Sequence, residues 1–166
     1  MKKVCAMLSL VLLTSASFAH ATDLVVDWGS IVGVITAPNV NNPVGTINSG
    51  TFPWSTRSGR AGVNLSTGAA FFAVEGLVIN GGAALSGTPG PVTQVIGTLV
   101  CNSGDPTPTI LDTPAVRLDK QGDAFFSGRI DGIPASCVNP LFLVRIATPA
   151  GAAGLWIATG AERSVG

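Results

Sequence analysis

The 166-residue chain carries nine basic and nine acidic side chains, which give a formal net charge of zero at neutral pH. This balance excludes the strongly basic surface with which proteins bind nucleic acids or anionic membranes. The length suits one domain with a single hydrophobic core.

The N-terminus has the pattern of a secretory signal peptide. Two lysines precede an apolar run over residues 4–18, and Ala19-His20-Ala21 follows as an A-x-A cleavage site. The apolar run is shorter than the roughly 20 residues that a membrane-spanning helix needs. We therefore expect cleavage after Ala21, no membrane insertion after signal removal, and a single β-sandwich domain over residues 22–166. The expected location is the periplasm or the exterior of a bacterial cell.

Cleavage would remove His20, the single histidine of the chain, together with two of the nine basic residues. A chain without histidine forms neither a Ser-His-Asp or Cys-His nucleophile system nor the histidine-rich sites that zinc and copper usually occupy. We predict no metal, no cofactor and no enzymatic activity.

Two cysteines, Cys101 and Cys137, remain after cleavage and are separated by 36 residues. An even number of cysteines in an oxidising compartment predicts a disulfide, with a free thiol pair or a two-ligand metal site as alternatives. A loop of this length predicts a stabilisation of about 3 to 4 kcal/mol.

The first predicted strand covers residues 24–35. Val26, Trp28, Val32 and Val34 share one phase of its alternation, so we expect this face to be buried. Glycines in the other phase indicate a bend or a bulge.

The next segment, residues 36–62, is rich in proline, asparagine and glycine and predicts repeated turns. Aromatic and arginine side chains in such a loop can contact a sugar or a protein partner. Alternatively, the two aromatic residues fold back and plug the end of the core. The candidate ligand-binding residues are Phe52, Trp54, Arg57 and Arg60.

Strand patterns resume at residues 69–80 and 93–101. Glu75 interrupts the first of these runs, either as an outward-facing residue or as a catalytic acid. The second run is apolar in both phases, which is typical of a central strand. A proline-containing loop over residues 102–109 ends it.

A hairpin is predicted over residues 116–130, with alternating strands on either side of a turn that contains Asp119 and Asp123. We interpret these two acids as a solvated turn, because a calcium loop needs more oxygen ligands at closer intervals. Strands at 141–147 and 154–161 follow, and the polar tail after residue 161 is expected to fray.

These seven or eight short strands predict an all-β fold: an antiparallel β-sandwich, or a small partly open barrel, with one disulfide. The leading functional hypothesis is a secreted, non-enzymatic module that binds an unidentified protein or carbohydrate at the cell surface or in the periplasm. Self-association as the subunit of a surface filament is one alternative. The other is a histidine-free carbohydrate-active enzyme that uses a carboxylate pair such as Glu75 and Asp131.

Overall fold

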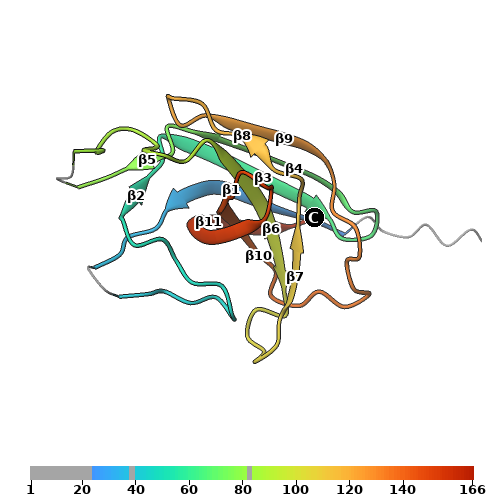
Figure 1. Ribbon diagram of the computed structural model, residues 1–166. Helices are drawn as coiled ribbons and strands as arrows, with labels where there is room; N and C mark the ends of the chain where they lie inside the picture. Colours follow the sequence, from blue (N-terminus) through green and yellow to red (C-terminus); the bar gives the residue numbers. More distant parts are fainter. Residues whose placement is uncertain (1–23, 38–39, 82–83) are drawn as a thin grey trace, which may run out of the picture.

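The computed structural model describes residues 24–37, 40–81 and 84–166. The predicted signal peptide, residues 1–21, lies outside this part of the chain. All regular elements within the described ranges are strands (Figure 1), which confirms the all-β fold class. These ranges contain no helix that is long and apolar enough to cross a membrane.

Nine of the eleven strands form one antiparallel sheet, and the other two form a small separate ladder. The order of the large sheet is β7-β6-β10-β11-β1-β3-β4-β9, and β8 pairs with β6 beside β7. The sheet is curved, so that β8 comes near β9 (Figure 1). The architecture is therefore the partly open barrel rather than a sandwich of two sheets. The strands of the large sheet are β1 (Val25–Gly33), β3 (Ser58–Asn64), β4 (Ala69–Glu75), β6 (Gln94–Cys101), β7 (Thr109–Asp112), β8 (Val116–Arg117), β9 (Ala124–Arg129), β10 (Leu141–Ala147) and β11 (Ala153–Val165), and the small ladder joins β2 (Trp54–Ser55) to β5 (Val78–Ile79).

Large aromatic rings fill the concave side of the sheet. The ring centroids of Trp28 and Phe142 are 5.5 Å apart, and those of Phe72 and Phe142 are 5.7 Å apart. Glycines on neighbouring strands make room for them. A Cβ atom on Gly97 would lie 2.8 Å from the rings of Phe72 and Phe142, and one on Gly160 would lie 2.6 Å from Trp28.

Strand β1 changes its buried phase halfway along. Val26 and Trp28 are buried as predicted, but Val32 is exposed and Ile31 is buried in its place. The segment after β2 lies against this half of β1, because the hydroxyl of Thr56 donates a hydrogen bond of 2.6 Å to the carbonyl oxygen of Ile31. A second layer therefore buries Ile31 in place of Val32, while Val34, directly after the strand, is buried as predicted.

The turn-rich segment between β1 and β3 is bound to β11. The backbone N–H of Gly50 donates to the carbonyl oxygen of Trp156 at 2.7 Å, and the N–H of Trp156 donates to Asn48 at 3.0 Å. The indole Nε1 of Trp156 donates to the carbonyl oxygen of Asn42 at 2.8 Å. Ile47 and Ser49 are buried as a result. This segment is a cover of the sheet rather than a free recognition loop.

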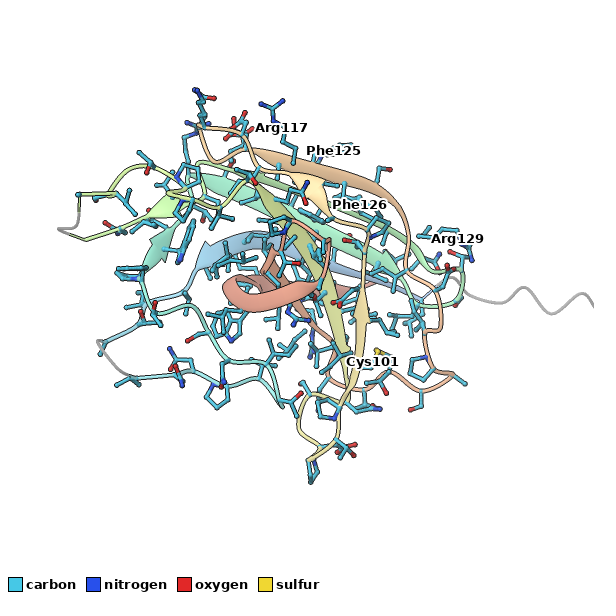
Figure 2. The ribbon with its side chains drawn as sticks, in the orientation of Figure 1. Cys101, Arg117, Phe125, Phe126 and Arg129 are labelled. Atoms are coloured by element: carbon cyan, nitrogen blue, oxygen red, sulfur yellow. A yellow bond between two sulfur atoms is a disulfide. The ribbon has the colours of Figure 1, made fainter. Side chains whose placement is uncertain are left out.

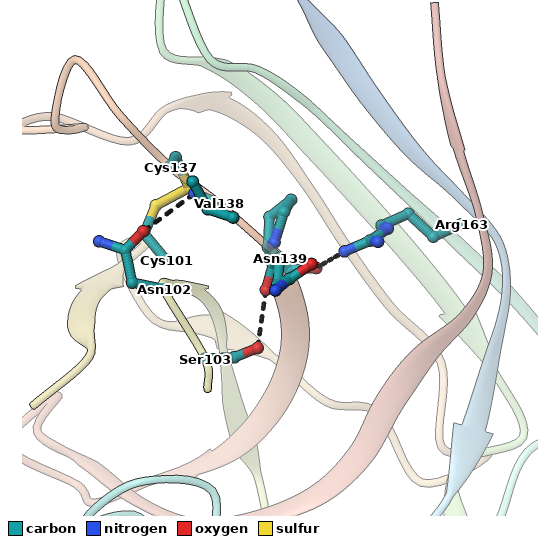
Figure 3. The surroundings of a disulfide bond; sticks show 8 residues. Cys101, Asn102, Ser103, Cys137, Val138, Asn139 and Arg163 are labelled. Carbon is teal, nitrogen blue, oxygen red and sulfur yellow. Dashed lines mark hydrogen bonds between the residues drawn. A yellow bond between two sulfur atoms is a disulfide. The ribbon is translucent and has the colours of Figure 1, made fainter. Parts of the chain in front are cut away.

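The predicted disulfide is confirmed. Cys101 at the end of β6 is bonded to Cys137, with 4.7 Å between the Cα atoms. Next to the bridge, the backbone N–H of Asn102 donates to the carbonyl oxygen of Val138 at 2.7 Å, and the N–H of Val138 donates to the side chain of Asn102 at 3.0 Å (Figure 3). Strand β6 is buried on both faces, as its two apolar phases predict, and it pairs with β10.

The two strands of the predicted hairpin over residues 116–130 do not pair with each other, so this prediction is wrong. β8 pairs with β6, and β9 pairs with β4. The turn between them does form: the backbone N–H of Asp119 donates to the carbonyl oxygen of Asp123 at 3.1 Å. The carboxylate of Asp119 accepts the N–H groups of Gln121 and Asp123, each at 2.9 Å. Beyond this turn the two strands separate because each finds a longer partner elsewhere in the sheet.

The expectation of a frayed C-terminal tail is also wrong. β11 continues to Val165, which lies opposite Val26 of β1. Backbone hydrogen bonds to β1 hold the tail regardless of its polar side chains, because a ladder uses the N–H and C=O groups that every residue except proline carries.

Candidate functional site

The four candidate residues from the sequence do not form one surface. Trp54 is only 4% exposed and belongs to the hydrophobic core, while its backbone N–H donates to the carbonyl oxygen of Val34 at 2.8 Å. This burial removes Trp54 from the candidate binding surface and matches the alternative in which the ring plugs the core. Phe52, two residues earlier, is half exposed.

Arg57 and Arg60 belong instead to the outer face of β3, β4 and β9. The guanidinium of Arg57 lies 3.5 Å from the carboxylate of Glu75 and 3.8 Å from that of Asp123. Arg60 places its guanidinium over the ring of Phe71, 5.6 Å from the centroid. Both arginines therefore mark a face on which charged and aromatic side chains meet.

Phe125 is the most exposed aromatic side chain of this face. The sheet register places Arg60 opposite Ala73, and Ala73 opposite Phe125. The side chain of Phe125 is 64% exposed although it lies within a regular strand. Small Ala73 beside it leaves the face of the strand open on that side.

The sequence contained a signal for Phe125, although the residue was not among the predicted candidates. In the alternation of residues 124–130, Phe125 shares its phase with Ser127 and Arg129, opposite the buried residues Ala124 and Phe126. A phenylalanine in the polar phase of an amphipathic strand is therefore a marker of an apolar surface position.

Next to Phe125 lies an open trough of about 760 Å³, which we call the β8–β9 trough. Figure 2 shows Arg117 and Phe125 close together at the upper margin of the sheet. The trough contains both charge signs and one aromatic ring. Its lining consists of Ala73, Val74, Glu75, Arg117, Asp119, Gln121, Asp123, Ala124 and Phe125.

The carboxylates of the trough are already engaged in the fold. The Asp123 carboxylate accepts the backbone N–H of Gly76 at 2.8 Å, and Glu75 accepts the hydroxyl of Ser58 at 3.0 Å. These contacts tie the carboxylates to neighbouring strands. These hydrogen bonds fix the positions of the two negative charges on the surface.

The carboxylate pair suggested from the sequence is wrong. Glu75 lies at the end of β4 beside Asp123, which precedes β9. Asp131 follows the other end of β9 and forms an ion pair with Arg129. A six-residue strand separates the two ends, which corresponds to roughly 20 Å. Glycosidases hold their two carboxyl groups within about 10 Å of each other, so Glu75 and Asp131 do not act on one glycosidic bond.

Within residues 24–37, 40–81 and 84–166, no group of three or more histidine, cysteine, aspartate or glutamate side chains is arranged to hold a metal ion. No protein-family model, curated protein or solved structure matches the chain. The outer face of β3, β4 and β9 and the β8–β9 trough are the candidate functional surface of the described residues.

Proposed function

We propose that the protein is a secreted, non-enzymatic interaction module of the periplasm or the bacterial cell surface, and that it binds a protein partner through Phe125 and the β8–β9 trough. The single observation that carries the proposal is the 64% exposure of a phenylalanine within a regular, hydrogen-bonded strand. The predicted signal peptide and the disulfide between Cys101 and Cys137 support the compartment.

Phe125 has the properties of an interface anchor. Full burial of a phenylalanine side chain stabilises a complex by about 1.5 to 3 kcal/mol. Because the ring is on a strand that is hydrogen-bonded to β4, little backbone order has to be gained on binding. Energetically dominant interface residues are commonly aromatic side chains surrounded by polar groups.

The trough supplies the polar rim around this anchor. Of its lining residues, Arg117 carries positive charge, and Glu75 and Asp123 carry negative charge. Arg57 lies beside these two carboxylates, at 3.5 Å and 3.8 Å. Mixed charges at a rim select partners and set the association rate more than they set the affinity. The trough is open along its length, whereas small-molecule pockets enclose most of their ligand, so a protein surface fits it better.

The test uses a photoreactive phenylalanine analogue at position 125 and, as a matched control, at position 52. Phe52 is also half exposed but lies away from the trough residues. We expect a crosslinked partner from the cell envelope at position 125 that is absent at position 52. With the purified partner, Phe125→Ala should weaken binding at least tenfold, while Phe52→Ala should change it by less than twofold.

Equal crosslinking from both positions, or an unchanged affinity in Phe125→Ala, would contradict the proposal. Binding of a polysaccharide that Phe125→Ala abolishes would also contradict the assignment of a protein partner and would favour a carbohydrate ligand at the same ring.

A further inference from the structure

Three stretches of the sequence carry no acidic or basic side chain, and the fold brings parts of them to one end of the sheet. Gly33, the last residue of β1, lies opposite Ala158 of β11. Ile146, near the end of β10, lies opposite Val95, near the start of β6, and β10 pairs with β11. The loops that follow β1 and β10 and the loop that precedes β6 therefore leave the sheet at the same end. The uncharged stretches are residues 28–56, 76–104 and 146–161.

Four large apolar side chains are exposed on these loops, and we call this group the apolar end. Ile35, two residues after β1, is 87% exposed, so its side chain contributes little to the stability of the fold. Exposed apolar side chains that gather on one surface mark a contact with a protein or a membrane. The other three members are Val40, Phe52 and Leu85, which are 51%, 49% and 42% exposed.

Hydrogen bonds hold the loops of the apolar end next to one another. The hydroxyl of Thr36 donates to the carbonyl oxygen of Thr51 at 3.4 Å, which joins the segment after β1 to the segment before β2. The backbone N–H of Asn80 donates to the carbonyl oxygen of Pro53 at 2.8 Å, which joins that segment to the loop after β5. Figure 1 shows the loops beside β2 and β5 projecting from the sheet on the same side.

Polar backbone groups around Ile35 and Val40 are paired within the loop. The side-chain amide of Asn42 donates to the carbonyl oxygen of Ile35 at 3.3 Å. The N–H of Val40 donates to the carbonyl oxygen of Ala37 at 3.1 Å. A paired polar group costs less to remove from water than an unpaired one. These contacts therefore favour transfer of the apolar end into a less polar environment.

The absence of charge on these loops favours a neutral lipid surface over a protein as the partner of the apolar end. Protein interfaces have a polar rim in which charges select the partner and guide its approach. A charged side chain is costly at the acyl chains of a bilayer, and the four side chains of the apolar end are flanked by none within residues 28–56 and 76–93. Side chains that protrude from separate loops also need no partner of matching shape when they enter lipid.

We propose that the apolar end rests on a zwitterionic phospholipid bilayer, with its four side chains at the boundary between the headgroups and the acyl chains. The contact is interfacial, so no segment of the chain spans the bilayer. The charged residues at the same end of the sheet belong to the neighbouring β8–β9 trough and its turn, and they remain in water. Phe125 is not part of this contact, so the bilayer site is separate from the proposed protein-binding site.

The test is co-sedimentation with phosphatidylcholine vesicles, using protein purified after expression of the full chain. We expect binding that is equal at low and at high ionic strength, because no charge pairing contributes to it. Ile35→Asp should lower the partition coefficient at least tenfold, since it removes an apolar side chain from the contact and adds a charge.

Val165→Asp is the matched control. Val165 is also exposed, and it lies opposite Val26, at the other end of β1 from Ile35. The two variants add the same charge, so an effect of net charge would appear in both. Val165→Asp should change the partition coefficient less than twofold.

A fluorescent label reports directly which end touches the lipid. Ile35→Cys, labelled with an environment-sensitive fluorophore, should show blue-shifted and stronger emission when phosphatidylcholine vesicles are added. Labelled Val165→Cys should show no change. Cys101 and Cys137 are bonded to each other in both variants and do not take up the label.

No binding of the unmodified chain to these vesicles, or binding that high ionic strength removes, would overturn the proposal. Equal losses in Ile35→Asp and Val165→Asp would overturn it as well. Dimers in sedimentation equilibrium that Ile35→Asp dissociates, without vesicle binding, would assign the apolar end to a second copy of the chain instead.

The outcome is separable from that of the proposed partner binding. Phe125→Ala should leave the partition coefficient on vesicles unchanged, and Ile35→Asp should still bind the protein partner. Each proposal can therefore fail while the other holds.

Discussion

The guanidinium of Arg145 on β10 lies 3.3 Å from the carboxylate of Asp112 on β7, across the intervening strand β6. Thr98 of β6 donates its hydroxyl to the same carboxylate oxygen at 2.6 Å. The other guanidinium nitrogens donate to the carbonyl oxygens of Gly154 at 2.7 Å and Ala153 at 3.1 Å. The arginine that interrupts an apolar strand in the sequence therefore connects four strands.

We expect Asp112→Ala to lower the free energy of unfolding by about 1 to 3 kcal/mol, because it leaves a largely buried guanidinium without its anionic partner. Asp105→Ala is the matched control: Asp105 is exposed on a loop, and its loss should change stability by less than about 0.5 kcal/mol. Urea unfolding curves of both variants check this. Equal midpoints would show that the ion pair contributes nothing measurable.

Removal of the disulfide should lower stability by about 3 to 4 kcal/mol, because the unfolded chain regains the freedom of a 36-residue loop. The variant is Cys101→Ser combined with Cys137→Ser, and the measurement is denaturant unfolding with and without a reductant. The reductant should shift the midpoint of the unmodified protein and leave that of the double variant unchanged. A shift in both would indicate an effect other than reduction of this bridge.

Gly97→Ala should lower stability by about 1 to 3 kcal/mol, since the added methyl group forces apart the rings of Phe72 and Phe142. Gly104→Ala is the control, because nothing lies within 4 Å of the position that its Cβ would take. Thermal unfolding distinguishes the two substitutions. A loss of similar size at both positions would mean that backbone effects, not ring packing, account for it.

The pair Trp54 and Phe52 provides a further comparison within one short segment. Trp54→Ala should cost about 3 to 5 kcal/mol because it leaves a cavity in the core, whereas Phe52→Ala affects a half-exposed ring and should cost less than about 1 kcal/mol. Chemical denaturation measures both values. A larger loss for Phe52→Ala would contradict the burial of Trp54.

The sequence predicted features that depend on local alternation and on cysteine count. Val26 and Trp28 are buried in phase, β6 is apolar on both faces, and Cys101 is bonded to Cys137. Alternation identifies a strand and its buried face because side chains point to opposite sides at every step. These features needed no knowledge of which strands are neighbours.

Which strands pair with each other could not be predicted from the sequence in this way. Residues 116–130 satisfy the pattern of a hairpin, yet β8 pairs with β6 and β9 with β4. The hydrogen bonds between strands use backbone groups common to nearly all residues. The side chains of a strand therefore do not specify which other strand it pairs with. The same reason explains why the polar residues after Ala161 belong to β11 instead of fraying.

The site was predicted only in part. Arg57 and Arg60 lie on the candidate face, but Trp54 is buried in the core, on a two-residue strand that pairs with β5. The alternation of β9 by itself was enough to identify Phe125 as a surface position. Arg117 lies near it because the turn between β8 and β9, which the sequence did predict, is closed by the hydrogen bond between Asp119 and Asp123.

The pairing of β1 with β11 sets the order in which the chain can fold. These two strands form the middle of the sheet, with Val26 opposite Val165. In the hydrogen-bonded order of the sheet, they join the half that contains β3, β4 and β9 to the half that contains β6, β7 and β10. Because this contact joins opposite ends of the described chain, its loop-closure entropy is large and folding is expected to be slow. The sheet is therefore completed only after the last residues of β11 have been synthesised, and a chain interrupted before that point exposes the edges of two half-sheets.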